Sequence, residues 1–487
     1  MTKIHRCFIL LVVIALQVSS SASAQNNGFI SERVYQVKDI HPGLSASHPF
    51  GFFEFNGSIY FSAFDANHGY EVWSSDGTEE GTKLLKDIYP GTQQSVYVFD
   101  ATELNGKFYF TADDSIHGQE IWQSDGTEAG TRLFKDVYLG STGSSPVLLT
   151  TANGFLFFCA ADPSGQQLWR TDGSNSGTLK ITTIPYENNS CGQIKTKGVD
   201  FLGWFYFIIN TGHPSGNQLA RTDGTPGHIE LIESELSTIT YSYPAILKLV
   251  GNKLFFTADA SINGFGLDLW EVEGPAVEAH LVKNISPNTY GNADPQELTD
   301  FQGMLYFTAN DGSVNIRKLW RSDGTSDNTV SLPSANGQTD YVGASALTVL
   351  GDHIIFQACF SDVGCELAST EGNHVKLVKN INPRNCSDLG ECSSSPEYLV
   401  EISGQILFNA ASDWIFPNDR ELWRTDGTEE GTQRVADICT GTCSSEPWYL
   451  TKNGYRILFS ADDGLRGREL WAYTPQLFPS YLPLVIR

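Results

Sequence analysis

The chain has 487 residues, of which 31 are Lys or Arg and 56 are Asp or Glu, so its formal net charge is −25 at neutral pH. Nucleic acids and anionic membranes are poor partners for so acidic a surface. Either a solubilising surface or the binding of divalent cations accounts for this charge.

The N-terminus predicts export. Basic residues between positions 3 and 6 precede an apolar run at 8–16 and a small-residue cleavage pattern at 22–24. We interpret residues 1–24 as a signal peptide, whose removal takes away two basic residues and no acid and brings the formal charge to −27. No later stretch approaches the roughly 20 apolar residues of a transmembrane helix. The sequence therefore predicts a secreted or cell-surface protein without a transmembrane segment, with the periplasm as the alternative location.

One unit of about fifty residues repeats along the mature chain. Its clearest marker is an apolar triplet that ends in Phe and recurs nine times, with successive Phe residues 48 to 52 positions apart. This spacing is typical of propeller and solenoid repeats. The nine Phe residues are Phe61, Phe110, Phe158, Phe207, Phe256, Phe307, Phe356, Phe408 and Phe459.

Each unit predicts four strands in two hairpins. In the first unit, strands at 50–55 and 58–64 flank the turn Asn56-Gly57, a dipeptide that favours tight hairpins. A strand around Trp73 then turns through Asp76-Gly77-Thr78 into a fourth strand that ends at residue 88. Four strands per unit are the content of a propeller blade. The sequence therefore predicts an all-β fold at 25–475, a single β-propeller of about nine blades, with eight blades or two smaller propellers as alternatives.

The twelve residues at 421–432 read Glu-Leu-Trp-Arg-Thr-Asp-Gly-Thr-Glu-Glu-Gly-Thr. This segment resembles the ELWxxDGT repeat of a family of exported bacterial proteins, and the resemblance covers roughly residues 34–473. It implies propeller-like repeats in an exported protein. It implies no activity that can be carried over to this chain.

The two ends of the repeat array complement each other. The last unit stops after its Trp strand, whereas residues 34–40 read as a fourth strand that no first, second or third strand precedes. We expect residues 34–40 to pair with residues 468–473 and to close the ring, because pairing also protects an open strand edge. The apolar tail at 476–487 lies outside the repeat, where it is either a sorting signal or a docked strand.

The cysteine pattern predicts disulfides. Eight Cys residues remain after the signal peptide, an even number in an exported chain. Three pairs are close in sequence, and the fourth follows by elimination. The expected pairs are Cys359 with Cys365, Cys386 with Cys392, Cys439 with Cys443, and Cys159 with Cys191.

Two sets of acidic residues recur in the units. The Asp of the Asp-Gly-Thr turn is expected to cap the following backbone amides, because turn chemistry repeats wherever the turn does. A second set precedes the Trp strands, and its oxygens are candidates for Ca²⁺, although no EF-hand loop is present and no cofactor is required. The turn residues are Asp76, Asp125, Asp172, Asp223, Asp323 and Asp426, and the second set comprises Asp65, Asp113, Asp114, Asp162, Asp259, Asp311, Asp413, Asp462 and Asp463.

Aromatic residues that break the repeat are the ligand candidates, since side chains that a blade does not require are free to bind. The repeated residues Trp73 and Trp122 are expected to pack between blades, with carbohydrate stacking as the alternative. His68 and His117 recur at one blade position and are expected to be loop residues. The loop candidates for ligand binding are Tyr97, Tyr290, Trp414 and Trp448.

These observations favour a non-catalytic extracellular binding or scaffolding module. Its loops would bind a glycan, a peptide or a protein at one rim of the propeller or in the central channel. The alternative is a polysaccharide-active hydrolase or lyase on the same scaffold, because a propeller fold alone does not choose between the two roles. No residue is assigned to catalysis, and the sequence indicates no oligomeric state.

Overall fold

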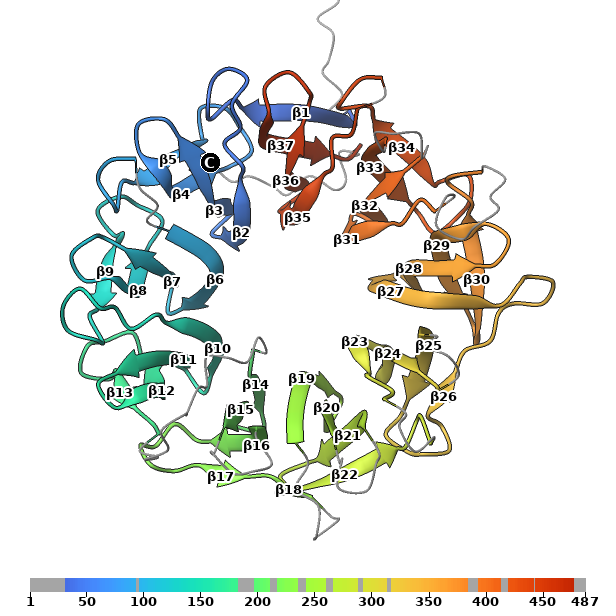
Figure 1. Cartoon of the computed structure of the whole chain (residues 1–487), viewed down its shortest axis with the longest axis horizontal. Coiled ribbons are helices and arrows are strands. Elements are labelled where there is room, and N and C mark those ends of the chain that lie inside the picture. Colours follow the sequence, from blue (N-terminus) through green and yellow to red (C-terminus); the bar gives the residue numbers. More distant parts are fainter. Residues whose placement is uncertain are drawn as a thin grey trace, which may run out of the picture.

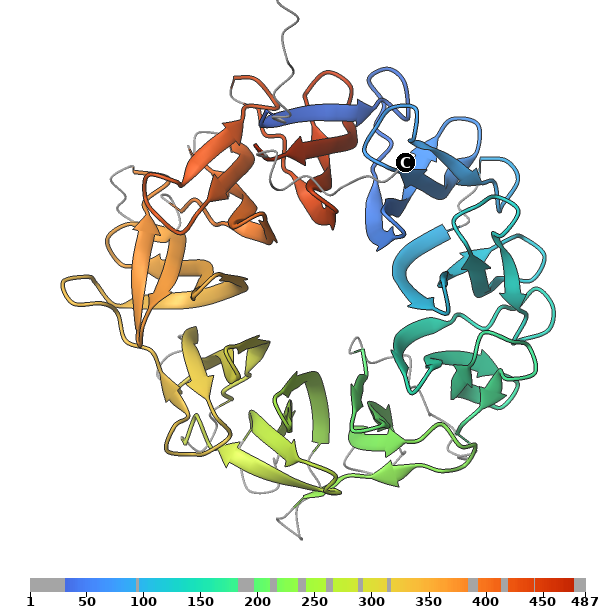
Figure 2. The same ribbon diagram turned by 180° about the vertical axis from the view of Figure 1, so that it is seen from behind.

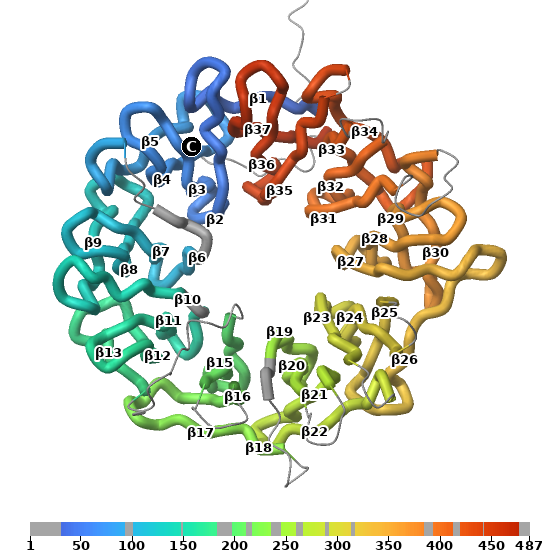
Figure 3. Tube along the Cα trace, in the orientation of Figure 1, coloured from blue at the N-terminus to red at the C-terminus, as the bar shows by residue number. Residues whose placement is uncertain are grey.

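The structure, a computed structural model, describes residues 31–92, 96–182, 197–210, 217–234, 242–259, 266–287, 292–312, 317–383, 393–412, 419–441 and 443–476. Nine sheets, antiparallel except for one short parallel pair, are arranged in one ring, with the first strand of each blade nearest the ring axis (Figure 1). The chain passes once around this ring from blue to red (Figure 3). The predicted all-β, single-ring fold of nine blades is therefore confirmed.

The blades follow one another in chain order, and their strands run from the innermost to the outermost. Blades 1 to 4 comprise β2 Phe50–Phe55, β3 Ser58–Asp65, β4 Gly69–Ser75 and β5 Lys83–Lys86; β6 Val96–Leu104, β7 Lys107–Asp113, β8 Gln119–Ser124 and β9 Arg132–Lys135; β10 Val147–Ala152, β11 Phe155–Asp162, β12 Gly165–Thr171 and β13 Leu179–Lys180; and β14 Val199–Phe201, β15 Trp204–Asn210, β16 Asn217–Thr222 and β17 Glu230–Leu231. Blades 5 to 7 comprise β19 Ser242–Val250, β20 Lys253–Asp259, β21 Leu267–Glu273 and β22 Glu278–Lys283; β23 Gln296–Phe301, β24 Met304–Asn310, β25 Arg317–Ser322 and β26 Val330–Ser331; and β27 Tyr341–Leu350, β28 His353–Phe360, β29 Gly364–Glu371 and β30 His374–Lys379. Blades 8 and 9 comprise β31 Glu397–Ile402, β32 Gln405–Ala411, β33 Arg420–Thr425 and β34 Gln433–Ala436; and β35 Trp448–Asn453, β36 Arg456–Asp462, β37 Arg468–Thr474 and β1 Arg33–Lys38.

One blade departs from the four-strand pattern. The two-residue strand β18 (Glu233–Ser234) pairs in parallel with β22, so the sheet of blade 5 has five strands. This extra strand comes from the connection that leaves blade 4. Two neighbouring blades are thereby joined by backbone hydrogen bonds, a link that the sequence pattern did not predict.

The core consists of layers between neighbouring blades. The middle strands bury both faces; Phe61 of β3, for example, is fully buried. The Trp of the repeat lies in these layers, since Trp73 is 7% exposed and packs in one cluster with Phe61 and Leu470, across the contact between blades 1 and 9. Trp122 is 5% exposed and lies in the layer between blades 1 and 2. The prediction that these Trp side chains pack between blades is confirmed.

The N-terminal strand closes the ring as predicted. Strand β1 pairs antiparallel with β37, from Arg33 opposite Thr474 to Lys38 opposite Leu470. Figure 2 shows the blue strand alongside the red last blade from behind. Val37 and Ile40 are buried in the layer between blades 9 and 1. The two ends of the described chain are thus held in one sheet.

A repeated lysine connects each of several blades to the next. Lys38 Nζ donates hydrogen bonds to the carbonyl oxygens of Glu79 and Thr82, at 3.3 and 3.0 Å, where the Asp-Gly-Thr turn of blade 1 ends. Lys283 and Lys379 make the equivalent pairs of bonds to blades 6 and 8. The Lys of the fourth strand therefore donates hydrogen bonds to the carbonyl oxygens at the end of the next turn, and Lys38 does so across the point where the ring closes.

Alternating strands divide the connections between two faces of the ring. The turns between first and second strands and between third and fourth strands lie on one face, which we call the turn face. The remaining connections lie on the opposite face, which we call the loop face. Two predicted disulfides are confirmed on the loop face: Cys359–Cys365, which joins the ends of β28 and β29, and Cys439–Cys443 between blades 8 and 9.

The other disulfide predictions fall partly outside the described residues. Cys159 is disulfide-bonded, but its expected partner Cys191 is outside, as are Cys386 and Cys392. The predicted signal peptide and the tail beyond residue 476 are also outside. In the described part of the chain, no helix has the length and hydrophobicity that crossing a membrane requires.

Candidate functional site

The innermost strands share a bulge that directs one side chain per blade. In eight of the nine blades the pairing of the first two strands shifts register near the start of the innermost strand. In six blades the residue at one equivalent position of the bulge has a positive φ angle, a backbone shape that bulges use to turn a side chain. These residues are of five types, so the blade requires this backbone conformation but does not require a particular side chain. They are Gly51, Ile246, Glu297, Ala346, Tyr398 and Tyr449.

Tyrosine occupies this position in two adjacent blades. Tyr398 of β31 and Tyr449 of β35 have φ angles of 56° and 57° and are 41% and 38% exposed. Their ring centroids are 6.5 Å apart, and the Tyr449 ring is 6.3 Å from that of Phe52 on β2. We call Tyr398, Tyr449 and Phe52 the aromatic row. It crosses the innermost strands of blades 8, 9 and 1, which lie side by side in Figure 1.

Two arginines lie next to the aromatic row. Arg420 and Arg468 begin the third strands of blades 8 and 9, and their side chains are 12% and 9% exposed. Arg420 Nη2 donates to the carbonyl oxygen of Ser395 at 2.7 Å, and Arg468 Nη1 donates to that of Glu446 at 2.8 Å. Both guanidinium groups therefore hold the connection that leads into an innermost strand.

Carboxylates accompany both arginines. Glu397 Oε2 and Glu446 Oε2 lie 3.6 Å from Nη2 of Arg420 and Arg468 respectively, and their side chains are 55% and 42% exposed. Burial lowers the pKa of each guanidinium, and the carboxylates act against that shift. The positive charges of the two arginines balance the negative charges of the two glutamates beside the row, although the net charge of the chain is −25.

The phenol group of Tyr398 stays protonated. Burial raises the pKa of Tyr398, and Glu397 and Tyr449 raise it further, while the two arginines lower it. A neutral phenol both donates and accepts hydrogen bonds. The row therefore combines apolar ring faces with hydroxyl groups and carboxylate acceptors.

Of the four aromatic residues that the sequence suggests for ligand binding, the structure describes the side chain of one. Trp448 was expected in a loop, but it is the first residue of β35, and its ring lies 3.8 Å from the Arg468 guanidinium carbon. Trp448 is equivalent to Phe50, the first residue of β2 in blade 1, so the repeat itself places it in a strand. Tyr97 belongs to β6, with a side chain outside the described part, and Tyr290 and Trp414 are outside altogether.

Sequence reasoning missed Tyr398, Tyr449, Arg420 and Arg468. A signal was present, because the two tyrosines each stand two residues after a proline, at Pro396 and Pro447, where other units have Gly51 or Glu297. Comparison of the units position by position would therefore have separated blades 8 and 9 from the rest.

The turn aspartates cap backbone amides, as predicted. Asp426 Oδ1 accepts hydrogen bonds from the backbone N and the Oγ1 of Thr428, at 2.9 and 2.7 Å, and Thr428 Oγ1 accepts one from the Gly431 amide. The same pattern recurs at Asp76, Asp125 and Asp172, with Ser174 replacing Thr in the last. These carboxylates are occupied in building the turn.

The loop aspartates bind their own loops in a similar way. Asp65 Oδ1 accepts hydrogen bonds from the amides of Asn67 and His68, and its Oδ2 lies 2.8 Å from His68 Nδ1. Asp114 holds His117 in the same manner. The hydrogen bond from the ring to the Asp carboxylate raises the pKa of both histidines. The prediction that His68 and His117 are loop residues is confirmed.

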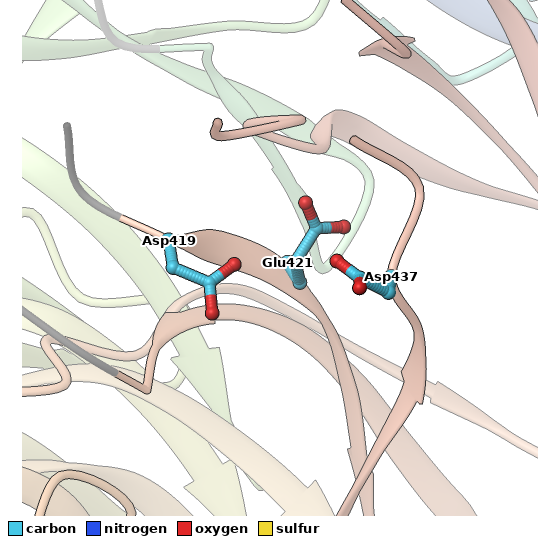
Figure 4. Close-up of side chains that lie close together, drawn as sticks. All are labelled: Asp419, Glu421 and Asp437. Atoms are coloured by element: carbon cyan, nitrogen blue, oxygen red, sulfur yellow. The ribbon is translucent and has the colours of Figure 1, made fainter. Parts of the chain in front are cut away.

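One carboxylate cluster has the spacing of a metal site. Oxygens of Asp419, Glu421 and Asp437 lie within 4.8 Å of one another, and Figure 4 shows both Asp carboxylates turned toward Glu421. Both Glu421 oxygens accept hydrogen bonds from the next connection, including one of 2.7 Å from Ser445 Oγ. Arg434 Nη1 lies 3.1 Å from Asp419 and 3.7 Å from Asp437. Arg434 already offsets part of the negative charge of this cluster, and calcium binding stays a prediction from the sequence.

Glu421 belongs to a set of buried carboxyl groups on the loop face. Glu366, Glu421 and Glu469 are fully buried, and each accepts hydrogen bonds from a serine hydroxyl of the following connection. Burial raises the pKa of each carboxyl to about 7, although those hydrogen bonds act against the shift. The Glu of the repeated Glu-Leu-Trp motif thus secures a connection and has no free oxygen for a substrate.

A shallow hollow of about 450 Å³ opens where the first two strands of blades 2 and 3 turn. Glu103 and Asp200 line it together with Asn105 and Asn153. The side-chain amide groups of both asparagines already donate to the carbonyl oxygens of Asp172 and Gly203. The hollow is polar and lacks exposed rings, so the aromatic row is the stronger candidate.

No protein-family model and no curated protein sequence matches the chain. Among solved structures, a puromycin hydrolase is 12% identical with a TM-score of 0.38, and the match covers 79% of this chain and 63% of that one. A puromycin-hydrolyzing peptidase of Mycobacterium tuberculosis is 9% identical, with a TM-score of 0.39 and coverages of 79% and 60%. The β-propeller domain of the Trilobed protease from Pyrococcus furiosus is 12% identical, with a TM-score of 0.33 and coverages of 69% and 98%. The chain spans about three fifths of the two hydrolases, and a likeness this distant identifies no activity.

Proposed function

We propose that the chain is a non-catalytic extracellular binding module whose ligand lies against the aromatic row. The observation that carries the proposal is the exposure of Tyr398 and Tyr449 in adjacent blades, at a bulge position where the blade accepts any side chain. Aromatic rings contribute much of the binding energy at interfaces, and adjacent exposed rings gain most when a ligand covers them.

The setting of the row supports binding. Arg420 and Arg468 fix the connections before β31 and β35 through hydrogen bonds to backbone carbonyls. A site on strands held in this way is preorganised, so little ordering entropy is lost when the ligand binds. The glycan, peptide or protein ligand expected from the sequence would meet a surface that is already in place.

Binding screens with catalytic controls test the proposal. We expect the mature protein to retain a ligand on an array of glycans and peptides without releasing products from a panel of polysaccharides. The double variant Tyr398→Ala/Tyr449→Ala should lose that ligand. Ile246→Ala, which changes the same bulge position in blade 5, is the matched control and should retain it. Product release that survives further purification would instead support the hydrolase or lyase alternative.

A further inference from the structure

Resting on the proposed function, we infer that the ligand of the aromatic row is an uncharged oligosaccharide that lies across blades 8, 9 and 1. The arrangement of the rings, the hydrogen-bonding groups beside them and the local balance of charge support a ligand of this class in this direction.

The rings form a continuous apolar surface and not a slot. The centroid distances of 6.5 and 6.3 Å are contact distances, and the two ring pairs are tilted by 56° and 55°. No flat group fits between rings that touch, so a ligand lies over them. Because each ring comes from a different blade, an elongated ligand that covers all three lies across the strands. A chain of sugar rings offers an apolar face of C–H groups to each aromatic ring in turn.

The polar groups beside the rings favour a ligand that donates hydrogen bonds. Glu397 and Glu446 are exposed carboxylates that only accept, and the two phenol groups of the row both donate and accept. Sugar hydroxyls donate to carboxylates and exchange hydrogen bonds with phenols. A proline-rich peptide also lies well on aromatic surfaces, but its prolines have no N–H to give to the two carboxylates. The acceptors therefore favour a glycan over a peptide of that kind.

The charges favour a neutral glycan. Arg420 and Arg468 are nearly buried, and each already donates to a backbone carbonyl and lies beside a carboxylate. Little positive charge is left for an anionic sugar, and the net charge of −25 repels anionic polymers as a whole. An uncharged oligosaccharide needs no free positive charge in the site, and the net charge of the protein does not repel it.

The test uses the mature protein and titration calorimetry with neutral, anionic and amino-sugar oligosaccharides and with proline-rich peptides. We expect a neutral oligosaccharide to bind with an affinity that changes little between low and high salt. Tyr398→Ala and Tyr449→Ala should each weaken binding about tenfold, the effect of losing one stacked ring. Tyr398→Phe should retain most of the affinity, because it keeps the ring and loses only the hydroxyl. Thermal unfolding checks that each variant is folded.

Two further variants sharpen the test. Glu397→Gln keeps the size of the side chain, loses half of its acceptor capacity and should weaken binding by a few-fold. Ile246→Ala should leave binding unchanged. An affinity that survives the double tyrosine variant would place the glycan elsewhere and overturn the inference.

The remaining outcomes separate the two proposals. A preference for anionic sugars with a steep salt dependence, or for peptides over every glycan, would overturn the inferred ligand class while the binding function stands. If no oligosaccharide or peptide on the array or in calorimetry binds to the folded protein, the proposed function fails along with the inference.

Discussion

At the scale of single residues, each Asp-Gly-Thr turn depends on a carboxylate and on the space kept for it. A Cβ added to Gly431 would lie 1.9 Å from Asp426 Oδ1, and the equivalent distance at Gly81 to Asp76 is 2.0 Å. The second glycine of the repeat is therefore required by the aspartate and not by its own backbone angle. The motif Asp-Gly-Thr-x-x-Gly-Thr describes one hydrogen-bonded unit.

Asp426→Ala tests this unit. The change removes two hydrogen bonds from Thr428, and we expect the free energy of unfolding to fall by about 1 kcal/mol, as for other capping residues. Asp426→Asn keeps an acceptor oxygen at the same place and should lose less. Denaturant unfolding of both variants measures the difference, and equal losses would show that charge and not capping is the role of Asp426.

The buried carboxyl groups predict that stability falls as pH rises. The pKa of about 7 for Glu421 in the folded chain exceeds the ordinary glutamate value of 4.5. The fold therefore favours the protonated form, and the stabilisation present at low pH is lost as the pH rises from about 4.5 through 7. We expect Glu421→Gln, which cannot ionise, to reduce the slope of stability against pH in this window. Glu429→Gln, in the exposed turn, is the control, and an unchanged slope in Glu421→Gln would contradict the burial argument.

At the scale of strands, the sequence predicts the strand positions that repeat in every blade and misses the bulges and contacts that differ between blades. The spacing of the Phe triplets and the Asn-Gly turns predicts β2 at Phe50–Phe55 and the start of β3 at Ser58 as the structure has them. The bulge in the innermost strands is not predictable in this way, because residues as different as Gly51 and Tyr449 adopt it. Arg420 and Arg468 were missed because their side chains act on a connection more than twenty residues away in sequence. The candidate site therefore depends on contacts between blades, which a single unit does not reveal.

The connections on the loop face predict the remaining disulfides. Cys439–Cys443 joins two ends of one connection, and Cys386 with Cys392 occupies the equivalent connection one blade earlier. Peptide mapping without reduction should recover Cys386–Cys392 and Cys159–Cys191 as separate pairs. The loop between Cys386 and Cys392 is short, so this disulfide should stabilise the folded chain by less than about 3 kcal/mol. Free thiols, or bridges between other pairs, would contradict the assignment.

At the scale of the whole molecule, the ring depends on its first strand. Removal of residues 25–41 takes away β1, the Lys38 hydrogen bonds and the buried side chains of Val37 and Ile40. The two apolar side chains alone are worth at least about 3 kcal/mol. We expect this deletion to lower the melting temperature of the entire ring by several degrees in calorimetry.

The matched control for this deletion removes residues 476–487, which lie beyond the last strand and should matter less. If the N-terminal deletion melts within a degree or so of the intact protein, β1 does not secure the ring.

The pairing of β1 with β37 also sets the order in which the protein can fold during synthesis. Strand β1 has its partner at residues 470–474, so it waits until all the strands between them have been made. Blades 1 to 8 contain all their own strands and can form one after another as they emerge, because their contacts are local. Joining the two ends closes a loop of more than four hundred residues, the contact with the greatest entropic cost in the molecule. Until that moment β37 presents an open edge and blades 1 and 9 expose the apolar side chains that pack between them in the ring, so the incomplete ring is exposed to aggregation.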